Sequence, residues 1–386
     1  MIGIFNDCYP PVIDGVSVTV RNYARWLNRK CGDVCVVTPS VPGTVYDEDF
    51  PVYDYFSLPI PMRRPYRMGL PAVDLDFRSR IGRVDFSLVH AHSPFSSGRL
   101  AMRLARQQGV PVVATFHSKY RADFERVIPN KAVVDYLVKG IVDFYDRADE
   151  VWVPQAGVEE TLREYGYRGR VEIVDNGNDF ATAGDISPLR AEGRAMLGLP
   201  PSVPALLFVG QHIYEKNPHL IIRALARLRD RSWHMYFVGT GYAADELRRL
   251  AVSKGLESRI TFMGMVTDRE RLKRCYAAAD LFVFPSLYDN APLVVREAAA
   301  MGTPALLAEG STAAGVLAAG INGFTCRADE RSLADRLLFL LARPAMLSAA
   351  GSNARKTLAR PWSDVADEVY DRYIHIIRRS NRTEVA

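Results

Sequence analysis

Residues 284–304 read Phe-Pro-Ser-Leu-Tyr-Asp-Asn-Ala-Pro-Leu-Val-Val-Arg-Glu-Ala-Ala-Ala-Met-Gly-Thr-Pro, and the organisation of the chain can be worked out from this stretch. The apolar run 281–284 predicts a short strand, and residues 292–302 predict a helix. Asp289 falls in the loop between them, and Glu297 falls inside the helix, eight positions later. Exposed amides at a helix start favour negative charge, so this is a candidate phosphosugar site. The alternative is a helix cap followed by a solvated glutamate, because any strand–helix unit can carry two acids.

The chain has 386 residues, of which 48% are hydrophobic and 24% are charged, as in an ordinary globular protein. A single hydrophobic core stops growing below this length, so we expect two domains. The formal net charge of +5 is modest, and no nucleic-acid partner is expected.

The five cysteines, at positions 8, 31, 35, 275 and 326, are odd in number and include no C-x-x-C pair. This pattern predicts reduced thiols in a cytoplasmic compartment, without a zinc site or a disulfide framework. Met1 leads directly into a strand-like run, so no signal peptide is expected, and no apolar run is long enough to span a bilayer. Any contact with a membrane is therefore expected to be peripheral.

Short β-branched runs alternate with helical patterns along most of the chain, which predicts parallel sheets with crossover helices. In the first half, the predicted strands cover residues 1–5, 34–38, 87–90, 112–115, 150–153 and 171–174. In the second half, they cover residues 205–209, 234–238, 260–262, 281–284 and 305–307. The glycine- and proline-rich residues 176–204 are the predicted linker and the entry to a second domain.

We therefore predict an α/β fold of two doubly wound, Rossmann-like domains that face a central cleft, with ligands at the carboxyl ends of the strands. Residues 1–184 form the predicted N-terminal domain, and residues 185–360 form the C-terminal one. The last predicted helix, at 363–378, has an apolar face and is long enough to cross back. Residues 361–386 are therefore expected to pack on the first domain.

Residues 39–83 are proline-rich and predict a long surface loop of the kind that carries function. Its arginines outnumber its aspartates near the end, at Arg63, Arg64, Arg67, Arg78, Arg80 and Arg83. Aromatic and aliphatic side chains, including Tyr66, lie among them. Cations beside such groups suit an anionic membrane surface. The alternatives are a solvated basic face and a loop packed on its own domain.

Five short motifs occur in order, each at a predicted strand-to-helix junction. They are Gly-Val-Ser at 15–17, Thr-Phe-His-Ser at 115–118, Val-Gly-Gln-His-Ile-Tyr-Glu-Lys-Asn at 209–217, Gly-Thr-Gly at 239–241, and the stretch 284–304. In this order the chain resembles, over nearly its whole length, the retaining family-4 glycosyltransferases of the GT-B fold. It looks most like the bacterial enzymes that glycosylate membrane lipids, because of His-Ser-Pro-Phe at 92–95, Phe-His-Ser-Lys-Tyr at 116–120 and the Glu-Lys-Asn form of the lysine motif.

The resemblance implies a site for a nucleotide sugar donor. Lys216 matches a lysine aimed at the leaving diphosphate, Asp289 an acid near the transferred sugar, and Glu297 an acid that accepts hydrogen bonds from ribose hydroxyls. Gly15 has no Cβ, so its backbone can approach a diphosphate closely, although a structural turn glycine is the alternative. The implied donor contacts are Gly15, Val16, Gly210, Gln211, Lys216, Asp289, Leu293, Val294 and Glu297.

His117 matches a histidine beside the transferred sugar, where it would orient a hydroxyl; a satisfied cleft histidine is the alternative. With Lys216 and Asp289 it makes up the expected catalytic set. His90 and His92 are interpreted as lining residues and not as metal ligands. The expected acceptor and membrane contacts are Arg63, Arg64, Tyr66, Arg67 and Lys119.

The sequence departs from the family pattern at three places. Gln211 stands where the family usually has arginine, so one positive contact to the diphosphate is missing or is supplied by His212. Asp289 is one methylene shorter than the usual glutamate. The dipeptide at 291–292 is Ala-Pro where Phe-Gly is usual, and Pro292 has no N–H to offer a sugar hydroxyl. The sequence therefore does not identify the sugar.

The resulting hypothesis is a retaining hexosyltransferase that uses a nucleotide diphosphate sugar, UDP-glucose or UDP-galactose, at the inner face of the cell membrane. The acceptor would be a lipid hydroxyl of the diacylglycerol or ceramide type, and neither a cofactor nor a metal ion is expected. A soluble or polysaccharide acceptor is the alternative within the family. From other classes, the alternatives are a two-lobed binding protein without catalysis and a nucleotide-sugar epimerase.

Overall fold

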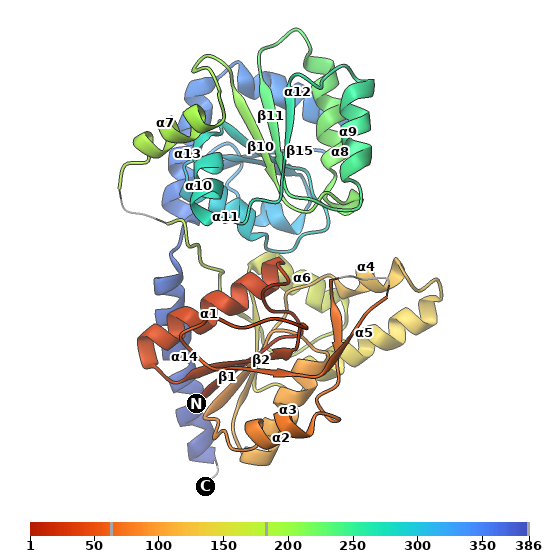
Figure 1. Cartoon of the computed structure of the whole chain (residues 1–386), viewed down its shortest axis with the longest axis vertical. Coiled ribbons are helices and arrows are strands. Elements are labelled where there is room, and N and C mark those ends of the chain that lie inside the picture. Colours follow the sequence, from red (N-terminus) through yellow and green to blue (C-terminus); the bar gives the residue numbers. More distant parts are fainter. Residues whose placement is uncertain (62–64, 182–183, 384–386) are drawn as a thin grey trace. The chain divides into compact units, whose positions relative to one another are not determined.

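The computed structural model describes residues 1–61, 65–181 and 184–383, and the chain divides into two compact units (Figure 1). The first unit holds Met1–Asn176 and the C-terminal segment that begins at Trp362, and the second holds Gly177–Pro361. The division therefore lies before the predicted one at 184/185. The reason is that the amide of Asn178 donates to the carbonyl of Arg360 at 2.8 Å, and the buried Phe180 belongs to the core of the second unit.

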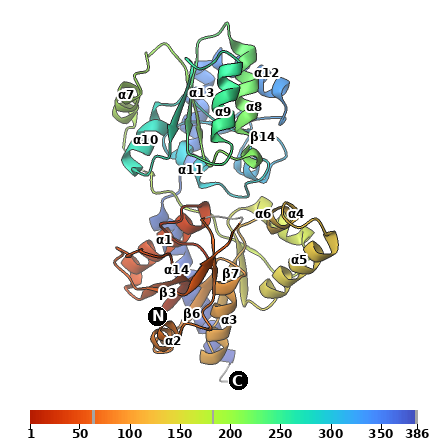
Figure 2. The same ribbon diagram turned by 45° about the vertical axis from the view of Figure 1, so that its right-hand side comes forward.

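The sheet of the first unit has seven parallel strands in the order β3-β2-β1-β6-β7-β8-β9. They are β1 (Ile2–Phe5), β2 (Val34–Pro39), β3 (Val52–Tyr55), β6 (Leu88–Ala91), β7 (Val112–Thr115), β8 (Glu150–Val153) and β9 (Glu172–Ile173). The strands β1, β2, β6 and β7 are buried at every position. Both faces of a parallel sheet are covered, so continuous apolar runs become its inner strands. The strands β3, β6 and β7 can be followed in Figure 2.

The helices of the first unit include one from the far end of the chain. They are α1 (Gly15–Cys31), α2 (Leu75–Ile81), α3 (Ser96–Gln108), α4 (Tyr120–Glu125), α5 (Lys131–Tyr145), α6 (Ala156–Glu164) and α14 (Trp362–Thr383). The last helix, drawn in blue in Figure 1, packs beside α1, drawn in red. Its predicted apolar face is buried, at Val365, Val369, Tyr373 and Ile376. Lys30 of α1 and Asp367 of α14 form an ion pair across this contact.

The described parts of the segment 39–83, residues 39–61 and 65–83, contain more secondary structure than the predicted surface loop. β3 joins the edge of the sheet, and β4 (Ser57–Pro59) pairs antiparallel with β5 (Arg67–Gly69). Tyr55 and Phe77 are both fully buried, with ring centroids 5.1 Å apart, and they fix β3 and α2 to the unit. Burial of these two aromatic rings stabilises the packing more than the prolines oppose it, so part of this segment packs on its own domain.

The sheet of the second unit has six parallel strands in the order β12-β11-β10-β13-β14-β15. They are β10 (Ala205–Val209), β11 (His234–Val238), β12 (Ile260–Gly264), β13 (Leu281–Phe284), β14 (Ala305–Ala308) and β15 (Gly323–Cys326). The helices are α7 (Ser187–Met196), α8 (Pro218–Leu225), α9 (Ala244–Ser253), α10 (Arg269–Ala278), α11 (Leu293–Ala300), α12 (Glu330–Leu341) and α13 (Pro344–Leu358). The described residues of this unit also form short 3₁₀ turns, η1 (Tyr214–Lys216), η2 (Ala226–Leu228) and η3 (Thr312–Val316).

Helix α7 lies inside the segment that the sequence predicted as a linker. Pro188 stands in its first turn, where the missing N–H costs nothing and the fixed φ suits a helix. Gly193 lets α7 approach α10, because a Cβ there would lie 2.2 Å from the carbonyl oxygen of Arg274. Proline and glycine therefore start and pack a helix here, where composition alone indicated a break.

In both sheets, the strand order reverses beside the first strand of the unit. The chain winds from β1 to β2 and β3 on one side and continues with β6 on the other, and it does the same around β10, with β13 on the far side. In doubly wound sheets, ligands bind at the carboxyl ends of the strands at such a reversal. The loops after β1 and β6, and after β10 and β13, are therefore the places to look for a site.

Candidate active site

The loop after β13 places an acid against a lysine. Asp289 Oδ1 accepts a hydrogen bond from Lys216 Nζ at 2.5 Å, and Asp289 Oδ2 accepts one from Ser286 Oγ at 2.6 Å. The lysine and aspartate side chains are only 13% and 16% exposed. Lys216 Nζ also lies 5.2 Å from the ring centroid of Phe284. Two predicted catalytic residues are thus brought together at the strand reversal of the second unit.

Asn217 locks the lysine loop onto the β13 loop. Its φ of 53° is in the left-handed region, which asparagine tolerates better than most residues. Its side-chain amide donates to the carbonyl of Pro285 at 3.0 Å. Pro218 then starts α8 in a position that suits proline. The Lys-Asn-Pro sequence therefore ends η1, fixes Lys216 and begins the next helix.

Glycines let the loops after β10 and β11 pack closely together. A Cβ on Gly239 would lie 2.0 Å from the carbonyl oxygen of Gly210, and one on Gly241 would lie 2.4 Å from that of His212. Gly239 also has a φ of 129°, which L side chains rarely adopt. Gly210 lies beside Lys216, because a Cβ there would be 3.4 Å from the lysine Cδ. The backbone next to the lysine therefore carries no side chain that would cover it.

Glu297 lies in α11 and is held from two sides by α10. Its Oε1 accepts from Arg269 Nη2 at 2.8 Å, and its Oε2 accepts from Tyr276 Oη at 2.7 Å. Arg269 also donates two hydrogen bonds to Asp179. Burial opposes the charge of the guanidinium, but the two carboxylates raise the pKa of Arg269. Burial, followed by the carboxylate of Glu297, raises the pKa of Tyr276, which stays a neutral donor.

These two partners of Glu297 were not found from the sequence. Arg269 and Tyr276 lie at the first turn and near the end of α10, and no motif marks them. The only local signal was Asp268, which caps α10 by accepting from the amides of Glu270 and Arg271. Contact with Glu297 depends on how α10 and α11 pack, and that information is not local.

Gly15 is the first residue of α1 and faces open space. A Cβ built on it meets no atom within 4 Å, and its φ is not positive. Neither crowding nor backbone conformation therefore requires glycine at this position. Asp14 caps the helix by accepting from the amide of Ser17 at 2.7 Å, and Val16 follows Gly15 in the first turn.

Three histidines lie with their rings close together and form what we call the histidine cluster: His90 within β6, His92 just after it, and His117 after β7. His92 Nδ1 lies 2.9 Å from His117 Nε2, and His90 bridges Thr115 Oγ1 at 2.7 Å and Tyr373 Oη at 2.5 Å. Burial lowers the pKa of His117 to about 3 and those of His90 and His92 well below the usual value. His117 is thus neutral, and its ring can donate or accept but carries no charge.

Asp7, which the sequence did not single out, follows β1 and faces the first turn of α3. Its carboxylate accepts from Ser93 Oγ at 2.5 Å, from the amide of Ser97 at 2.9 Å, and from Ser96 Oγ. These bonds join the loops on the two sides of the strand reversal in the first unit. Asp7 therefore has a structural task in this loop.

His212 does not replace the missing arginine. It is 2% exposed, and its ring packs among the rings of Phe208, Phe237 and Phe262. Burial, together with the nearby charge of Arg248, lowers its pKa to about 4. A neutral imidazole cannot supply a positive contact to a diphosphate, and Gln211, which is exposed, carries no charge either.

Pro292 stands at the N-cap of α11, and Leu293 and Val294 are the first two residues of the helix. Amides in the first turn of a helix have no partner within the helix, so those of Leu293 and Val294 point out of its start. Pro292 itself donates nothing, as the sequence indicated.

The predicted acceptor contacts are placed only in part. Arg67 lies in β5, and its guanidinium donates to the hydroxyl of Ser57 at 2.6 Å and to its carbonyl at 2.9 Å, so it holds the β4–β5 hairpin. Tyr66 and Arg67 line a small hollow together with Asp7. Lys119 is half-buried at the start of α4. Arg63 and Arg64 lie outside the described residues.

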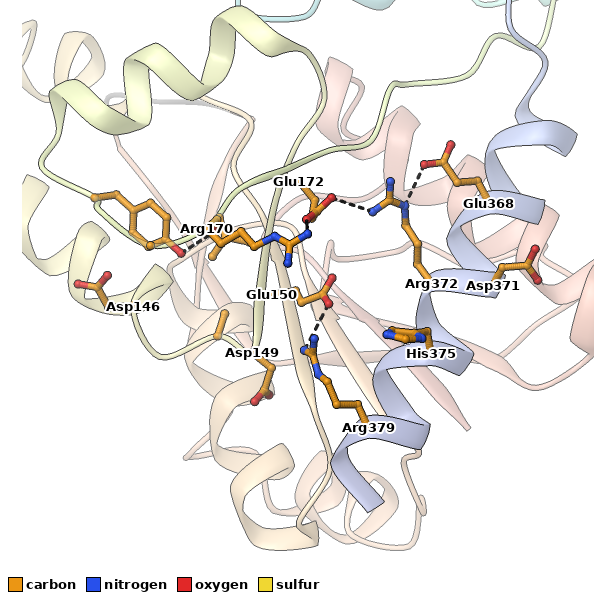
Figure 3. Close-up of a pocket in the computed structure, with 14 residues that line it drawn as sticks. Asp146, Asp149, Glu150, Arg170, Glu172, Glu368, Asp371, Arg372, His375 and Arg379 are labelled. Atoms are coloured by element: carbon orange, nitrogen blue, oxygen red, sulfur yellow. Dashed lines mark hydrogen bonds and ion pairs between the residues drawn. The ribbon is translucent and has the colours of Figure 1, made fainter. Parts of the chain in front are cut away.

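The first unit also has a pocket of about 670 Å³ between β8, β9 and α14, which none of the predicted site residues lines. Figure 3 shows Arg170, Glu172, Arg372 and Glu368 linked in a row, and Arg379 linked to Glu150. Glu172 accepts from Arg170 at 2.7 Å and from Arg372 at 3.3 Å, and Arg379 lies 3.3 Å from Glu150. These ion pairs tie α14 to the sheet edge, so we assign the pocket a structural role.

Within residues 1–61, 65–181 and 184–383, no group of three or more His, Cys, Asp or Glu side chains is arranged to hold a metal ion. Over the same described ranges, we find no helix that is both long enough and apolar enough to cross a membrane.

Comparison with known proteins identifies the family. The sequence model described as Glycosyltransferase Family 4 matches residues 13–181, and the one described as Glycosyl transferases group 1 matches residues 190–357. The chain is 25% identical over 320 residues to an alpha-monoglucosyldiacylglycerol synthase of Streptococcus pneumoniae, covering 79% of this chain and 70% of that protein. It is 24% identical over 400 residues to the enzyme of the same name from Acholeplasma laidlawii, covering 99% and 98%.

A D-inositol 3-phosphate glycosyltransferase of Catenulispora acidiphila is 31% identical over 324 residues, covering 76% of this chain and 72% of that protein. Among solved structures, sucrose-phosphate synthase of Thermosynechococcus elongatus aligns with a TM-score of 0.80 at 21% identity, covering 98% of this chain and 99% of that one. HepE of Anabaena, in complex with UDP and glucose, aligns with a TM-score of 0.76 at 17% identity, covering 96% and 98%. The chain therefore belongs to the family-4 glycosyltransferases and has the GT-B fold.

Proposed function

We propose that this glycosyltransferase is a retaining hexosyltransferase that moves a hexose from a UDP-sugar to the hydroxyl of a membrane lipid. The observation that carries the donor half is the pairing of Lys216 with Asp289 at the strand reversal of the second unit, beside the uncovered backbone of Gly210. The UDP complex of HepE, a protein of the same fold, supports the choice of nucleotide.

Lys216 would stabilise the leaving diphosphate. An ammonium group has three N–H donors, and Asp289 accepts one, so others remain for phosphate oxygens. In the reaction, the bond from the anomeric carbon to the phosphate oxygen breaks, and the acceptor oxygen bonds to the same face of the sugar. The acceptor proton passes to the departing phosphate. Positioning and charge stabilisation supply the catalysis, and no covalent enzyme intermediate forms.

Other residues would bind parts of the donor that do not react. The buried carboxylate of Glu297 suits two hydroxyls of the ribose, and the open surface at Gly15 suits close approach of a phosphate to the start of α1. The neutral His117 would exchange one hydrogen bond with a sugar hydroxyl and would not serve as a charged acid. No metal ion or cofactor has a role in this proposal.

The lipid half of the proposal rests on the names of the relatives and on one exposed surface. Two relatives are named as synthases of a glucosyldiacylglycerol. On the β4–β5 hairpin and directly before it, Phe56, Leu58 and Met68 are 46%, 42% and 52% exposed, although they are apolar. Apolar side chains that lie close in the sequence to Arg63, Arg64 and Arg67 suit the surface of an anionic bilayer.

The enzymatic test is a transfer assay with UDP-glucose or UDP-galactose and vesicles containing diacylglycerol or ceramide, with the product identified by mass. At donor concentrations below KM, we expect Glu297→Ala and Lys216→Ala each to lower the rate of transfer by at least tenfold, the first through weaker donor binding and the second through a lower kcat. Undiminished turnover in both variants would contradict the proposed donor site. Conversion of the donor sugar without any acceptor would instead identify an epimerase.

The membrane test compares binding to vesicles with and without anionic lipid. The double variant Phe56→Ser/Met68→Ser should bind less than the unmodified chain. Val252→Ser is the matched control, because Val252 is 60% exposed on α9 of the second unit. If the fraction bound to vesicles changes neither with anionic lipid nor with the hairpin variant, a soluble acceptor is favoured, as the names of the inositol-phosphate relatives suggest.

A further inference from the structure

The carboxylate of Glu297 is fixed at both oxygens. Arg269 donates to Oε1 at 2.8 Å from one side, and Tyr276 donates to Oε2 at 2.7 Å from the other. The glutamate is 6% exposed and the tyrosine is fully buried, so water competes little with these two hydrogen bonds. The carboxylate therefore has one orientation, set by two residues of the neighbouring helix α10.

This arrangement leaves room for further donors. Each carboxylate oxygen has two lone pairs, and the protein donors account for one at each oxygen. A ligand with two neighbouring hydroxyls could donate one hydrogen bond to the free lone pair of each carboxylate oxygen. A carboxylate that is already oriented loses little further freedom when such a ligand binds, and that raises affinity.

Arg269 is itself held by the segment through which the chain enters the second unit. It donates to the two oxygens of Asp179 at 2.6 and 3.1 Å, and its guanidinium lies 4.2 Å from the ring centroid of Phe180. The ring of Phe180 in turn meets that of Tyr276 edge-on, with centroids 5.9 Å apart. The pair Asp179 and Phe180 therefore supports both donors to Glu297.

We infer that Arg269 and Tyr276 are positioning residues for the nucleotide sugar, which act through Glu297, and that Asp179 acts in the same way through Arg269. This inference rests on the proposed function, in which Glu297 accepts the hydroxyls of the donor ribose. Because the ribose does not react, its contacts are the same in the bound substrate and in the transition state. Loss of a positioning residue should therefore change the affinity for the donor and leave kcat unchanged.

The experiment measures the dissociation constant of UDP by calorimetry, and KM for donor, KM for acceptor and kcat in the transfer assay. Tyr276→Phe removes only the hydroxyl, and Arg269→Met removes the guanidinium while keeping an apolar stem over Phe180. Each should raise the Kd of UDP and the donor KM by about tenfold, the value expected for a lost hydrogen bond to a charged group. Arg269→Lys keeps the charge but cannot span two carboxylates, so it should restore part of the affinity. Asp179→Asn should have a smaller effect in the same direction, about threefold.

Arg190→Met is the matched control. Arg190 has the same exposure as Arg269, 39% against 40%, and it also pairs with an aspartate of the second unit, Asp280. It further donates to the carbonyls of Ala277 and Ala279. Its loss should lower stability but leave the Kd of UDP unchanged, which separates positioning from a general loss of structure.

Two outcomes would overturn the inference. One is an unchanged Kd of UDP in Tyr276→Phe and Arg269→Met when Glu297→Ala weakens binding; the other is an equal loss of affinity in Arg190→Met. If Glu297→Ala itself leaves the Kd of UDP unchanged, the proposed function fails at this residue, and the inference fails with it. If Arg269→Met does not fold, Tyr276→Phe decides alone, because its ring packing is intact.

Discussion

A double-mutant cycle on Lys216 and Asp289 tests whether the central ion pair of the candidate site is energetically coupled. The variants are Lys216→Met, Asp289→Asn and the combination of both. The pair is short, at 2.5 Å, and largely shielded, with 13% and 16% exposure, so it should behave as a buried pair and not as a surface one.

The two single changes should differ in size. Lys216→Met leaves a shielded carboxylate that keeps Ser286, and we expect a loss of about 3 kcal/mol, the lower end of the range for broken buried pairs. Asp289→Asn leaves an ammonium that keeps its contact with the ring of Phe284 at 5.2 Å, so the loss should be about 1–2 kcal/mol. The double variant has no uncompensated charge. We expect it to lose about 2 kcal/mol less than the sum of the two.

The assay is urea unfolding of the second unit, followed by hydrogen exchange in peptides from β10 and β13. Arg331→Ala is the control, because the Arg331–Asp335 pair is 82% and 70% exposed and its loss should cost under about 1 kcal/mol. Additive losses in the double variant would refute the coupling. If the proposed function holds, all three site variants also lose transfer activity. Each of them lacks the ammonium proposed to stabilise the leaving diphosphate, the carboxylate proposed to lie near the transferred sugar, or both.

Three further predictions concern single positions. Gly239→Ala should destabilise the second unit by about 3 kcal/mol or more in urea unfolding, because φ is 129° and the new Cβ would lie 2.0 Å from the carbonyl of Gly210; a loss under about 1 kcal/mol would contradict this. Gly15→Ala should leave the melting temperature unchanged or slightly raised but weaken UDP binding about tenfold, and unchanged binding would exclude close phosphate approach there. The lowered pKa values of the histidine cluster contribute stability that is fully present above the unfolded pKa near 6.5 and is lost as the pH falls, for His117 toward about 3. His117→Asn should therefore flatten the fall in unfolding free energy between pH 6.5 and 4.5, which reaches about 1.4 kcal/mol per pH unit for a histidine with a lowered pKa, and an unchanged slope would show that folding does not lower the pKa of His117.

The sequence by itself determined the class of fold and the positions of the main motifs. The run at 281–284 is the strand β13 with the same bounds, and Gly15 opens α1 as predicted. Both follow from local information, since a strand covered on both faces needs a continuous apolar run and a helix start shows in its cap and its period. The pairing of Asp289 with Lys216 also fits the order of the motifs, because parallel strands bring their carboxyl ends to one edge.

Only the tertiary structure decided which neighbours complete the site. Arg269 and Tyr276 reach Glu297 because α10 packs beside α11. No sequence pattern within α10 predicts that contact. The surroundings of His212 are likewise contributed by strands that are distant in sequence, and their apolar rings remove the charge that its residue type suggests. Local patterns fix the elements, because their causes are local, whereas the charge and orientation of a side chain depend on atoms that only folding brings within a few ångströms.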